Sequence, residues 1–440
     1  MISNFAWRLR DLLKKVWVRV VGYALLAVVA AGLARALAPL IGEDTALQAG
    51  ADAVQSLLGV LTSSMLAVTT FSLSIAVSAF AAAAESATPR ATVLLQQDRT
   101  TQNVLSTFLG AFLFGLIGLI ALHAEVYGPS GRVVMFAFTV MVFGLVVVAL
   151  IRWIDHLMTF GRMRDTLERV EKAASKALRA RLRHPFLGGR RLDEAPPHAG
   201  APVAARKTGY VQHLDMKALQ SCAEAAGAQV VVRRLPGAFV AAGAPLLRVH
   251  PQPDDDAMDD LRRAVVLSPA RTFEDDPRFG LIVLTEIASR ALSPAVNDPG
   301  TAIEILGRHV RIIAEWRDRR DAEVSFDRVF VPAITLDDLF EDAFRPIARD
   351  GAPLAEVMIR FQKALASLHH VAPAVFADAC ARMSLEAVAR AEAAELLPLE
   401  LEAIRAAAPP GAHPGPRPET DSPSAARTWP EGPDPAGRRA

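Results

Sequence analysis

A row of hydroxyl side chains within an apolar stretch is the first feature of the sequence that could support chemistry. The stretch runs from Thr62 to Arg90 and holds about as many apolar residues as one bilayer crossing requires. At roughly 100° per residue, one side of a helix there carries small residues, hydroxyls and a carboxylate. The members of this hydroxyl seam that we single out are Ser63, Thr70, Ser74, Ser78 and Glu85.

Two interpretations of the hydroxyl seam remain open. Small residues four positions apart let neighbouring helices approach closely, and Ser or Thr can hydrogen-bond across such a contact or to its own helix. Helix packing is the commoner use of this pattern. The alternative is a narrow, hydroxyl-lined path for water or ions with Glu85 at its cytoplasmic mouth.

Two loops in the second half of the chain concentrate charged and turn-forming residues. The first contains Arg271, Glu274, Asp275, Asp276 and Arg278, and the second contains Ser293, Asn297, Asp298 and Thr301. Pro277 suits a first helical turn, and Thr301 with Glu304 predicts a capping box. One interpretation is structural, with charges that pair between the two loops and lock two helices. The alternative is a ligand-binding site.

No catalytic or metal-binding signature accompanies these residues. The sequence lacks a phosphate-binding loop, HExxH, GxSxG and a credible metal-ligand cluster. His369 and His370 are adjacent, so they point in different directions on a helix. We therefore predict no catalytic residue, no cofactor and no metal, and expect that the protein is not an enzyme.

The composition predicts a membrane part and a part outside the membrane. Hydrophobic residues make up 52% of the 440 residues and charged residues only 22%. The net charge of +1, without a basic patch interleaved with aromatic residues, argues against nucleic-acid binding. Cys222 and Cys380 lie far apart without a CxxC pair, which fits a reduced compartment.

Four apolar runs are long enough to cross a bilayer. Basic residues precede the first run and Arg152 with Trp153 ends the fourth, which predicts that both termini are cytoplasmic. Small residues in the third run, such as Gly115, permit close approach of a neighbour, and we expect this run to pack on the seam. No run has a carboxylate, lysine or histidine near its middle, so the relays of proton-coupled pumps are missing. The runs cover residues 16–41, 62–90, 105–126 and 132–154.

The expected fold class is an integral membrane, all-α N-terminal region of four transmembrane helices, followed by a soluble, mainly α domain with a small α+β module. After the membrane, an amphipathic helix could pack on its own domain, form an oligomerisation stalk or lie on anionic headgroups. The expected units are the transmembrane region 1–155, the juxtamembrane amphipathic helix 156–183, a linker 184–206, the α+β module 207–250, a mainly helical cytoplasmic domain 251–408 and a disordered Pro-rich tail 409–440.

Several sequence segments together resemble those of a bacterial family of predicted membrane proteins, the domain of unknown function 2254 family. They are TTFSLSIAVSAF, SATPR, GYVQ, PGAFVAAGAPL and TFEDDPRFGLIVLTEIASRALSPAVNDPGTA. The resemblance covers nearly the whole chain except the terminal tail. It implies a multipass inner-membrane protein with a cytoplasmic domain, and it implies no particular activity, substrate or catalytic residue.

The preferred functional hypothesis is an oligomeric membrane protein whose cytoplasmic domain regulates a passive channel or a membrane sensor. It follows from the hydroxyl seam and from the lack of catalytic sequence. A scaffold that docks a cytoplasmic protein partner is the alternative, and a membrane-anchored enzyme that uses the acidic loops is a third. The expected partners are the lipid bilayer and further copies of the chain.

Overall fold

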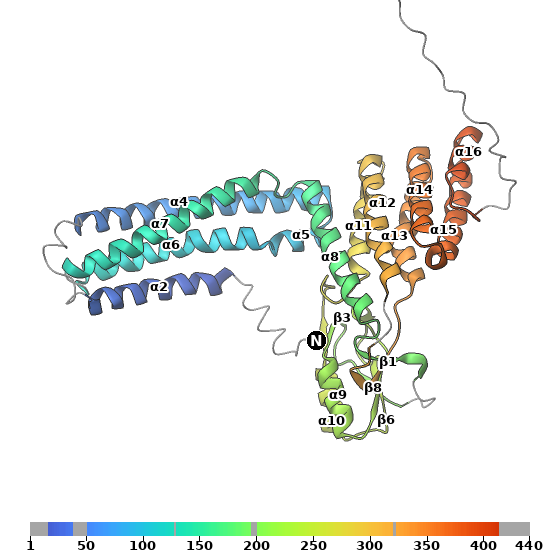
Figure 1. Cartoon of the computed structure of the whole chain (residues 1–440), viewed down its shortest axis with the longest axis horizontal. Helices are drawn as coiled ribbons and strands as arrows, with labels where there is room; N and C mark the ends of the chain where they lie inside the picture. The colour runs from blue at the N-terminus through green and yellow to red at the C-terminus, as the bar shows by residue number, and fades with distance from the viewer. Residues whose placement is uncertain (1–15, 38–50, 127–128, 195–199, 320–322, 413–440) are drawn as a thin grey trace, which may run out of the picture.

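A computed structural model describes residues 16–37, 51–126, 129–194, 200–319 and 323–412. Four of its helices are long and apolar enough to cross a membrane, which confirms the four expected spans. They lie side by side as a bundle, and the rest of the chain is attached at one end of it (Figure 1). The bundle helices are α2 (Val16–Leu37), α4 (Ala51–Ser86), α6 (Arg99–His123) and α7 (Pro129–Leu157).

Helix α6 is the central member of the bundle and packs against α2, α4 and α7. A Cβ added at Gly110 would overlap the Tyr23 ring of α2, and one added at Gly115 would overlap Thr62 Oγ1 of α4. The small residues of α6 therefore allow close helix approach, as expected. However, α6 meets the side of α4 that carries Leu58 and Thr62, and the expectation that it packs on the seam is wrong.

Two helices connect the bundle to the C-terminal domain, which we define as residues 163–412. Helix α5 (Pro89–Gln96) follows α4, and helix α8 (Met163–Arg183) follows α7. The apolar stripe of α8, with Leu167, Val170 and Leu178, is buried against this domain. Of the three interpretations of the juxtamembrane helix, packing on its own domain is thus the one observed.

The larger part of the C-terminal domain is helical and shares one core. Phe340, Phe344 and Phe361 are buried at its centre, with neighbouring ring centroids 5.2 and 5.6 Å apart. Helix α13 starts with a capping box, which Thr335 makes with Asp338. The elements are α11 (Phe279–Ala291), α12 (Pro299–Ile313), η3 (Ala314–Asp318), α13 (Leu336–Asp350), α14 (Ala355–Val371), α15 (Pro373–Ala393) and α16 (Pro398–Ala406).

The smaller part contains two sheets with α9 (Met216–Ala225) and α10 (Asp255–Arg263). A five-stranded sheet has the order β1-β8-β4-β6-β2, and a three-stranded sheet has the order β5-β3-β7. Strand β8 runs parallel to β1 and β4, whereas the other pairs are antiparallel. The strands are β1 (Gly189–Arg191), β2 (Ala201–Ala204), β3 (Gly209–Leu214), β4 (Gln229–Val232), β5 (Phe239–Val240), β6 (Pro245–His250), β7 (Val265–Ser268) and β8 (Phe326–Val331).

Two expected boundaries differ from this structure. The segment 184–206, which we interpreted as a linker, contributes β1, η2 (Leu192–Glu194) and β2 to the fold. Strands β1 and β2 are the edges of their sheet, where short segments and a proline such as Pro202 are tolerated, so their sequence resembles a linker. The α+β module also takes strands from beyond 207–250, because β7 and β8 lie within the segment 251–408. The predicted tail beyond residue 412 lies outside the described residues.

Candidate functional site

Every member of the hydroxyl seam is exposed on the outer side of α4. The opposite side of the helix, with Leu58 and Leu61, is buried in the bundle. Ser63 Oγ donates to the Gly59 carbonyl at 2.9 Å, and Ser78 Oγ donates to the Ser74 carbonyl at 3.0 Å. These hydroxyl protons are therefore satisfied within the helix. Within one described chain the seam neither packs on a neighbouring helix nor encloses a path.

The exposed side of α4 carries hydroxyl side chains in addition to large apolar ones, such as Phe71 (69% exposed) and Val77 (55% exposed), whereas α2 and α7 expose mainly large apolar side chains. On α2, Leu25 and Val28 are more than half exposed, and on α7 so are Ile151 and Ile154. Such large aliphatic side chains suit contact with lipid tails. On α4 the seam places small side chains at spacings of three and four residues among the large apolar ones, and small residues at these spacings are typical of helix contacts in membranes.

The turn from α7 into α8 lies against α4 at Ala79 and Phe80, between the seam residues Ser78 and Glu85. Gly161 has φ +75°, and a Cβ added there would lie 2.9 Å from Ala79 Cβ. The Phe160 ring meets the Phe80 ring of α4 edge-on at 5.9 Å. Arg169 of α8 places its guanidinium carbon 5.8 Å from the centre of the same Phe160 ring. Contacts are thus continuous from the C-terminal domain to the seam helix.

A charged cluster at the same end of the bundle escaped the sequence reasoning. Asp98 caps α6 by accepting a hydrogen bond from Thr101 N at 2.7 Å. Its carboxylate also lies 3.0 Å from His156 Nε2 of α7 and 2.6 Å from Arg169 Nη1 of α8. Burial would raise the pKa of Asp98, but the hydrogen bonds from His156, Thr101 and Arg169 hold this pKa far below its ordinary value. The cap could have been recognised from Asp98 followed by Thr101, whereas the partners could not.

The first charged loop caps the N-terminus of α11 through Asp276. Asp276 accepts hydrogen bonds from the backbone N–H groups of Arg278 at 3.1 Å and Phe279 at 3.2 Å, and from Arg271 Nε at 2.7 Å. Burial raises the pKa of Asp276, although Arg271 opposes this. The loop is held close to Gly237, which has φ +95° and leaves no room for a Cβ beside the Asp276 carboxylate.

Other charges of this loop bind elements distant in sequence. Arg278 donates to Asp342 at 2.5 Å and to Asp338 at 2.9 Å, both on α13. Asp275 lies 2.6 Å from His213 Nδ1 of β3, and Glu274 is exposed beside it. The expected ion pairing between the two loops is therefore wrong, because the first loop pairs with β3 and α13.

The second loop is a turn that starts α12. Ser293 Oγ donates to the Arg290 carbonyl at 2.7 Å, and Asn297 adopts φ +48°. Asp298 is the N-cap and accepts from Thr301 N at 3.1 Å. The predicted capping box of Thr301 with Glu304 is therefore wrong, because the N-cap is Asp298, three residues before Thr301. The two loops lie at opposite ends of the 13-residue α11, about 20 Å apart, so they do not form one site.

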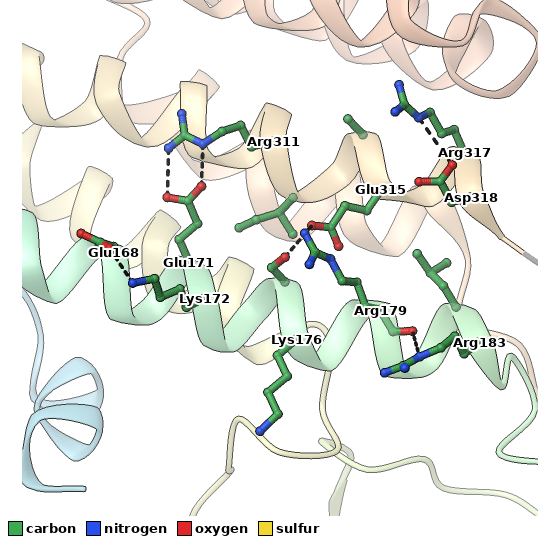
Figure 2. A pocket seen from close by; sticks show the side chains of 14 residues that line it. Glu168, Glu171, Lys172, Lys176, Arg179, Arg183, Arg311, Glu315, Arg317 and Asp318 are labelled. Carbon is green, nitrogen blue, oxygen red and sulfur yellow. Dashed lines mark hydrogen bonds and ion pairs between the residues drawn. The ribbon is translucent and has the colours of Figure 1, made fainter. Parts of the chain in front are cut away.

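A groove of about 1130 Å³ runs between α8 and the end of α12 with η3 (Figure 2). Glu171 binds Arg308 and receives Arg311 Nε at 2.6 Å. Burial acts to raise the pKa of Glu171, but Arg311 and Arg308 lower this pKa below its ordinary value. Further along the groove, Glu315 accepts from Arg179 Nη2 at 2.8 Å. Ion pairs thus cross the groove and hold the two helices together.

A second cavity of about 990 Å³ lies where α5, α8, β3 and α11 meet, and we call it the junction cavity. Apolar side chains make up much of its wall, including Val93, Leu94, Phe273, Phe279 and Ile282. Its charged lining includes Arg90, Lys176, Arg271, Glu274, Asp275 and Glu286. The volume is within the range typical of small-molecule sites, and apolar and charged side chains share the wall. The first charged loop therefore borders a cavity as well as capping a helix.

Within the described ranges, no group of three or more His, Cys, Asp or Glu side chains is arranged to hold a metal ion. The chemistry that the described site residues offer is thus that of hydroxyls in the membrane and of charges at the junction.

Comparison with known proteins gives one family. The family model described as "Predicted membrane protein (DUF2254)" matches residues 14–367. The Uncharacterized protein Rv1290c of Mycobacterium tuberculosis and the Uncharacterized protein Mb1321c of Mycobacterium bovis are each 34% identical over 118 residues. These residues are 26% of this chain, and the chain spans 23% of the length of each of these curated relatives. No solved structure matches the chain.

Proposed function

The chain belongs to the DUF2254 family of predicted membrane proteins, and from this premise we propose that it forms a homo-oligomer whose hydroxyl seams line a passive path for water or small ions. In this assembly the α4 helices of neighbouring copies face a common axis. The C-terminal domain regulates the path from the end of the bundle to which it is attached.

The observation that carries this proposal is the exposure of the hydroxyl seam on a helix whose other side is buried. Because Ser63, Thr70 and Ser78 each donate to their own helix, their oxygens remain available to accept hydrogen bonds from the exposed side. Rows of such oxygens can replace part of the hydration shell of a permeating cation. If the seam faced lipid tails, these oxygens would meet no hydrogen-bond donor.

The arrangement of ionisable side chains supports passive permeation. In α4, the only ionisable side chain after Asp52 is Glu85, which lies one residue before the helix ends at Ser86. At 36 residues α4 is about 54 Å long, and a bilayer core is about 30 Å thick, so Glu85 has room to lie outside the hydrocarbon region. A relay of carboxylates or histidines, as in pumps, has no members along this path.

We place the C-terminal domain and both termini in the bacterial cytoplasm, with the bundle in the inner membrane. Arg152 and Trp153 near the end of α7, with Arg162 and Arg164 shortly after it, favour this orientation by the positive-inside rule. Asn297 is exposed and reports the orientation when it is replaced by cysteine. In intact spheroplasts, Asn297→Cys should react with a membrane-impermeant maleimide only after the membrane has been opened.

The coupling between domain and path runs through Phe160 and Gly161. Both contact α4 next to the seam, at Phe80 and Ala79, and Arg169 of the C-terminal domain contacts Phe160. A shift of α8 would therefore be transmitted to α4 through this short turn. This contact is the basis for assigning a regulatory role to the domain.

Ion flux through the purified protein in liposomes tests the proposal. We expect potassium efflux from proteoliposomes that is lost in Ser74→Leu, because a larger apolar side chain would narrow the path and remove a hydroxyl. Leu73→Phe is the matched control, since Leu73 is 50% exposed on the same helix but lies about 100° around the helix from Ser74. Equal flux in Ser74→Leu and wild type, or no flux above protein-free liposomes, would overturn the proposal.

Disulfide crosslinking tests the oligomer. Ser74→Cys is made in a chain with Cys222→Ala, whereas Cys380 can stay because burial raises the pKa of its thiol to about 12. We expect oxidation in the membrane to link copies through position 74. Val28→Cys on the exposed side of α2 should give no comparable link, and equal crosslinking at both positions would contradict a specific α4 interface.

A further inference from the structure

We propose that the junction cavity binds an anionic membrane lipid, with the phosphate of the headgroup near Lys176 and the apolar part against α5 and α11. This site is separate from the hydroxyl seam. It would make the junction between bundle and C-terminal domain sensitive to the lipid composition of the adjoining leaflet.

The position of the cavity brings it within reach of lipid. Its α5 wall begins at Pro89, and only Ala87 and Thr88 separate α5 from the end of the membrane helix α4. Figure 1 places α5 at the end of the bundle, and β3, the opposite wall, on the part of the C-terminal domain below it. A lipid in the adjoining leaflet would therefore be next to this cavity.

The apolar side chains at this position are unusually exposed. Val93 on α5 lines the cavity and is 41% exposed. On the β3 side Tyr210 lines the cavity, and its ring packs edge-on at 5.1 Å against Phe239, which is 59% exposed. Aromatic residues with one wet and one apolar side are typical of membrane interfaces. These contacts favour a ligand with a hydrocarbon part.

The charges near the cavity favour an anion. At least four of the six charged lining side chains are already paired, because Arg90 binds Glu286, Asp275 binds His213 and Arg271 binds Asp276. Lys176 lines the cavity and makes no hydrogen bond or ion pair with another described residue. Lys176 also borders the α8–α12 groove, and Figure 2 shows its side chain directed away from the ion pairs that Glu171 and Glu315 make across that groove. Its ammonium group is thus the charge that a ligand would meet.

A buried arginine adds to this positive field. Arg181, five residues after Lys176 on α8, is only 5% exposed, and its Nη1 and Nη2 atoms have no hydrogen-bond partner among the described residues. Asp275, which lines the cavity, and Asp276 attract it electrostatically, but Asp275 is hydrogen-bonded to His213 and Asp276 to Arg271. A buried, incompletely paired guanidinium stabilises an anion nearby.

The size of the cavity distinguishes a lipid from a free phosphate. At about 990 Å³ it lies at the upper end of the usual range for small-ligand sites, and its lining is largely apolar. Inorganic phosphate or a soluble phosphomonoester would leave Val93, Ile282 and the aromatic side chains without a partner. An acyl chain would cover them.

Lipid binding to the purified full-length chain, measured by native mass spectrometry from detergent, tests the proposal without reference to flux. We expect phosphatidylglycerol to bind more tightly than phosphatidylcholine, and Lys176→Gln to weaken phosphatidylglycerol binding about fivefold. Lys172→Gln is the matched control, because Lys172 is exposed one turn earlier on α8 and lines the α8–α12 groove but not the junction cavity. Val93→Asp should also weaken binding.

Three results would overturn the proposal. They are equal binding of the two lipids, equal losses in Lys172→Gln and Lys176→Gln, and displacement of phosphatidylglycerol by glycerol phosphate alone, which would assign the site to a soluble phosphate. Circular dichroism and melting temperature of each variant must match the wild type, and Lys176→Arg, which keeps the charge, should restore binding. Loss of lipid binding with intact flux would leave the proposed path unaffected.

Discussion

Asp98 and Arg169 join the membrane bundle to the C-terminal domain. Asp98 Oδ1 lies 2.6 Å from Arg169 Nη1, although the two residues are 71 positions apart in the sequence. The side chain of Asp98 is 9% exposed and that of Arg169 is 22% exposed, so water screens this pair only weakly. Since Asp98 also caps α6, one carboxylate fixes the start of a bundle helix and the position of α8.

We expect Asp98→Asn to lower the free energy of unfolding by about 2–4 kcal/mol, because it leaves Arg169 partly buried without its charge partner. Thermal unfolding of the full-length protein in detergent, followed by intrinsic fluorescence, measures the effect. Glu168→Gln is the control, since it breaks the exposed ion pair with Lys172 on the same helix, which contributes only about 0.5 kcal/mol. Melting temperatures that fall equally in both variants would contradict a structural role for the Asp98–Arg169 pair.

Replacement of Gly237 should destabilise the first charged loop. In Gly237→Ala the new Cβ would overlap the carboxylate of Asp276 and break the cap of α11, and φ +95° would add backbone strain. Gly243→Ala has the same kind of strain at φ +85° but meets nothing within 4 Å. We expect a loss of about 1 kcal/mol at Gly243 from strain alone and at least twice that at Gly237. Similar losses at both positions would show that contact with Asp276 is unimportant.

Gly115 should be required for the packing of α6 on α4. The Cβ of Gly115→Ala would overlap Thr62 Oγ1, so we expect a destabilisation of about 1–3 kcal/mol, as is typical of overpacked cores. Gly144→Ala on α7 is the matched control, because a Cβ there meets nothing within 4 Å and alanine favours a helix. Its melting temperature should stay constant or rise. A stable Gly115→Ala would mean that the two helices can separate without cost.

Features set by neighbours along the chain could be predicted from the sequence. Hydropathy predicts the four spans, and the N-caps Asp215 of α9 and Thr335 of α13 accept hydrogen bonds from residues within one helical turn, so such caps are local features of the sequence. The position of the seam on one face of α4 also followed from the helical period.

Features set by distant partners could not be predicted in this way. Strand β1 is held by β8, more than a hundred residues later, and its own three residues carry no alternating pattern. Arg278 has carboxylates near it in sequence, yet it binds Asp338 and Asp342 of α13. The sequence also could not show that the seam faces outward, because that depends on which side of α4 meets α6.

His309 should make the C-terminal domain sensitive to acid. It is fully buried on α12, with Nε2 at 3.0 Å from Thr285 Oγ1, and burial lowers its pKa to about 3 despite the nearby Glu171. The unfolded chain takes up a proton at this histidine below about pH 6.5, whereas the folded chain does not. The stability is thus complete above pH 6.5 and is lost as the pH falls towards 3. At pH 5 the loss is about 2 kcal/mol.

We therefore expect the melting temperature of the wild type to fall more between pH 7 and pH 5 than that of His309→Gln. Glutamine cannot take up this proton, and its amide can still donate to Thr285. His370→Gln is the control, because His370 is exposed at the end of α14 and should leave the wild-type pH dependence unchanged. Parallel pH profiles for the wild type and His309→Gln would show that His309 is not the residue whose burial opposes protonation.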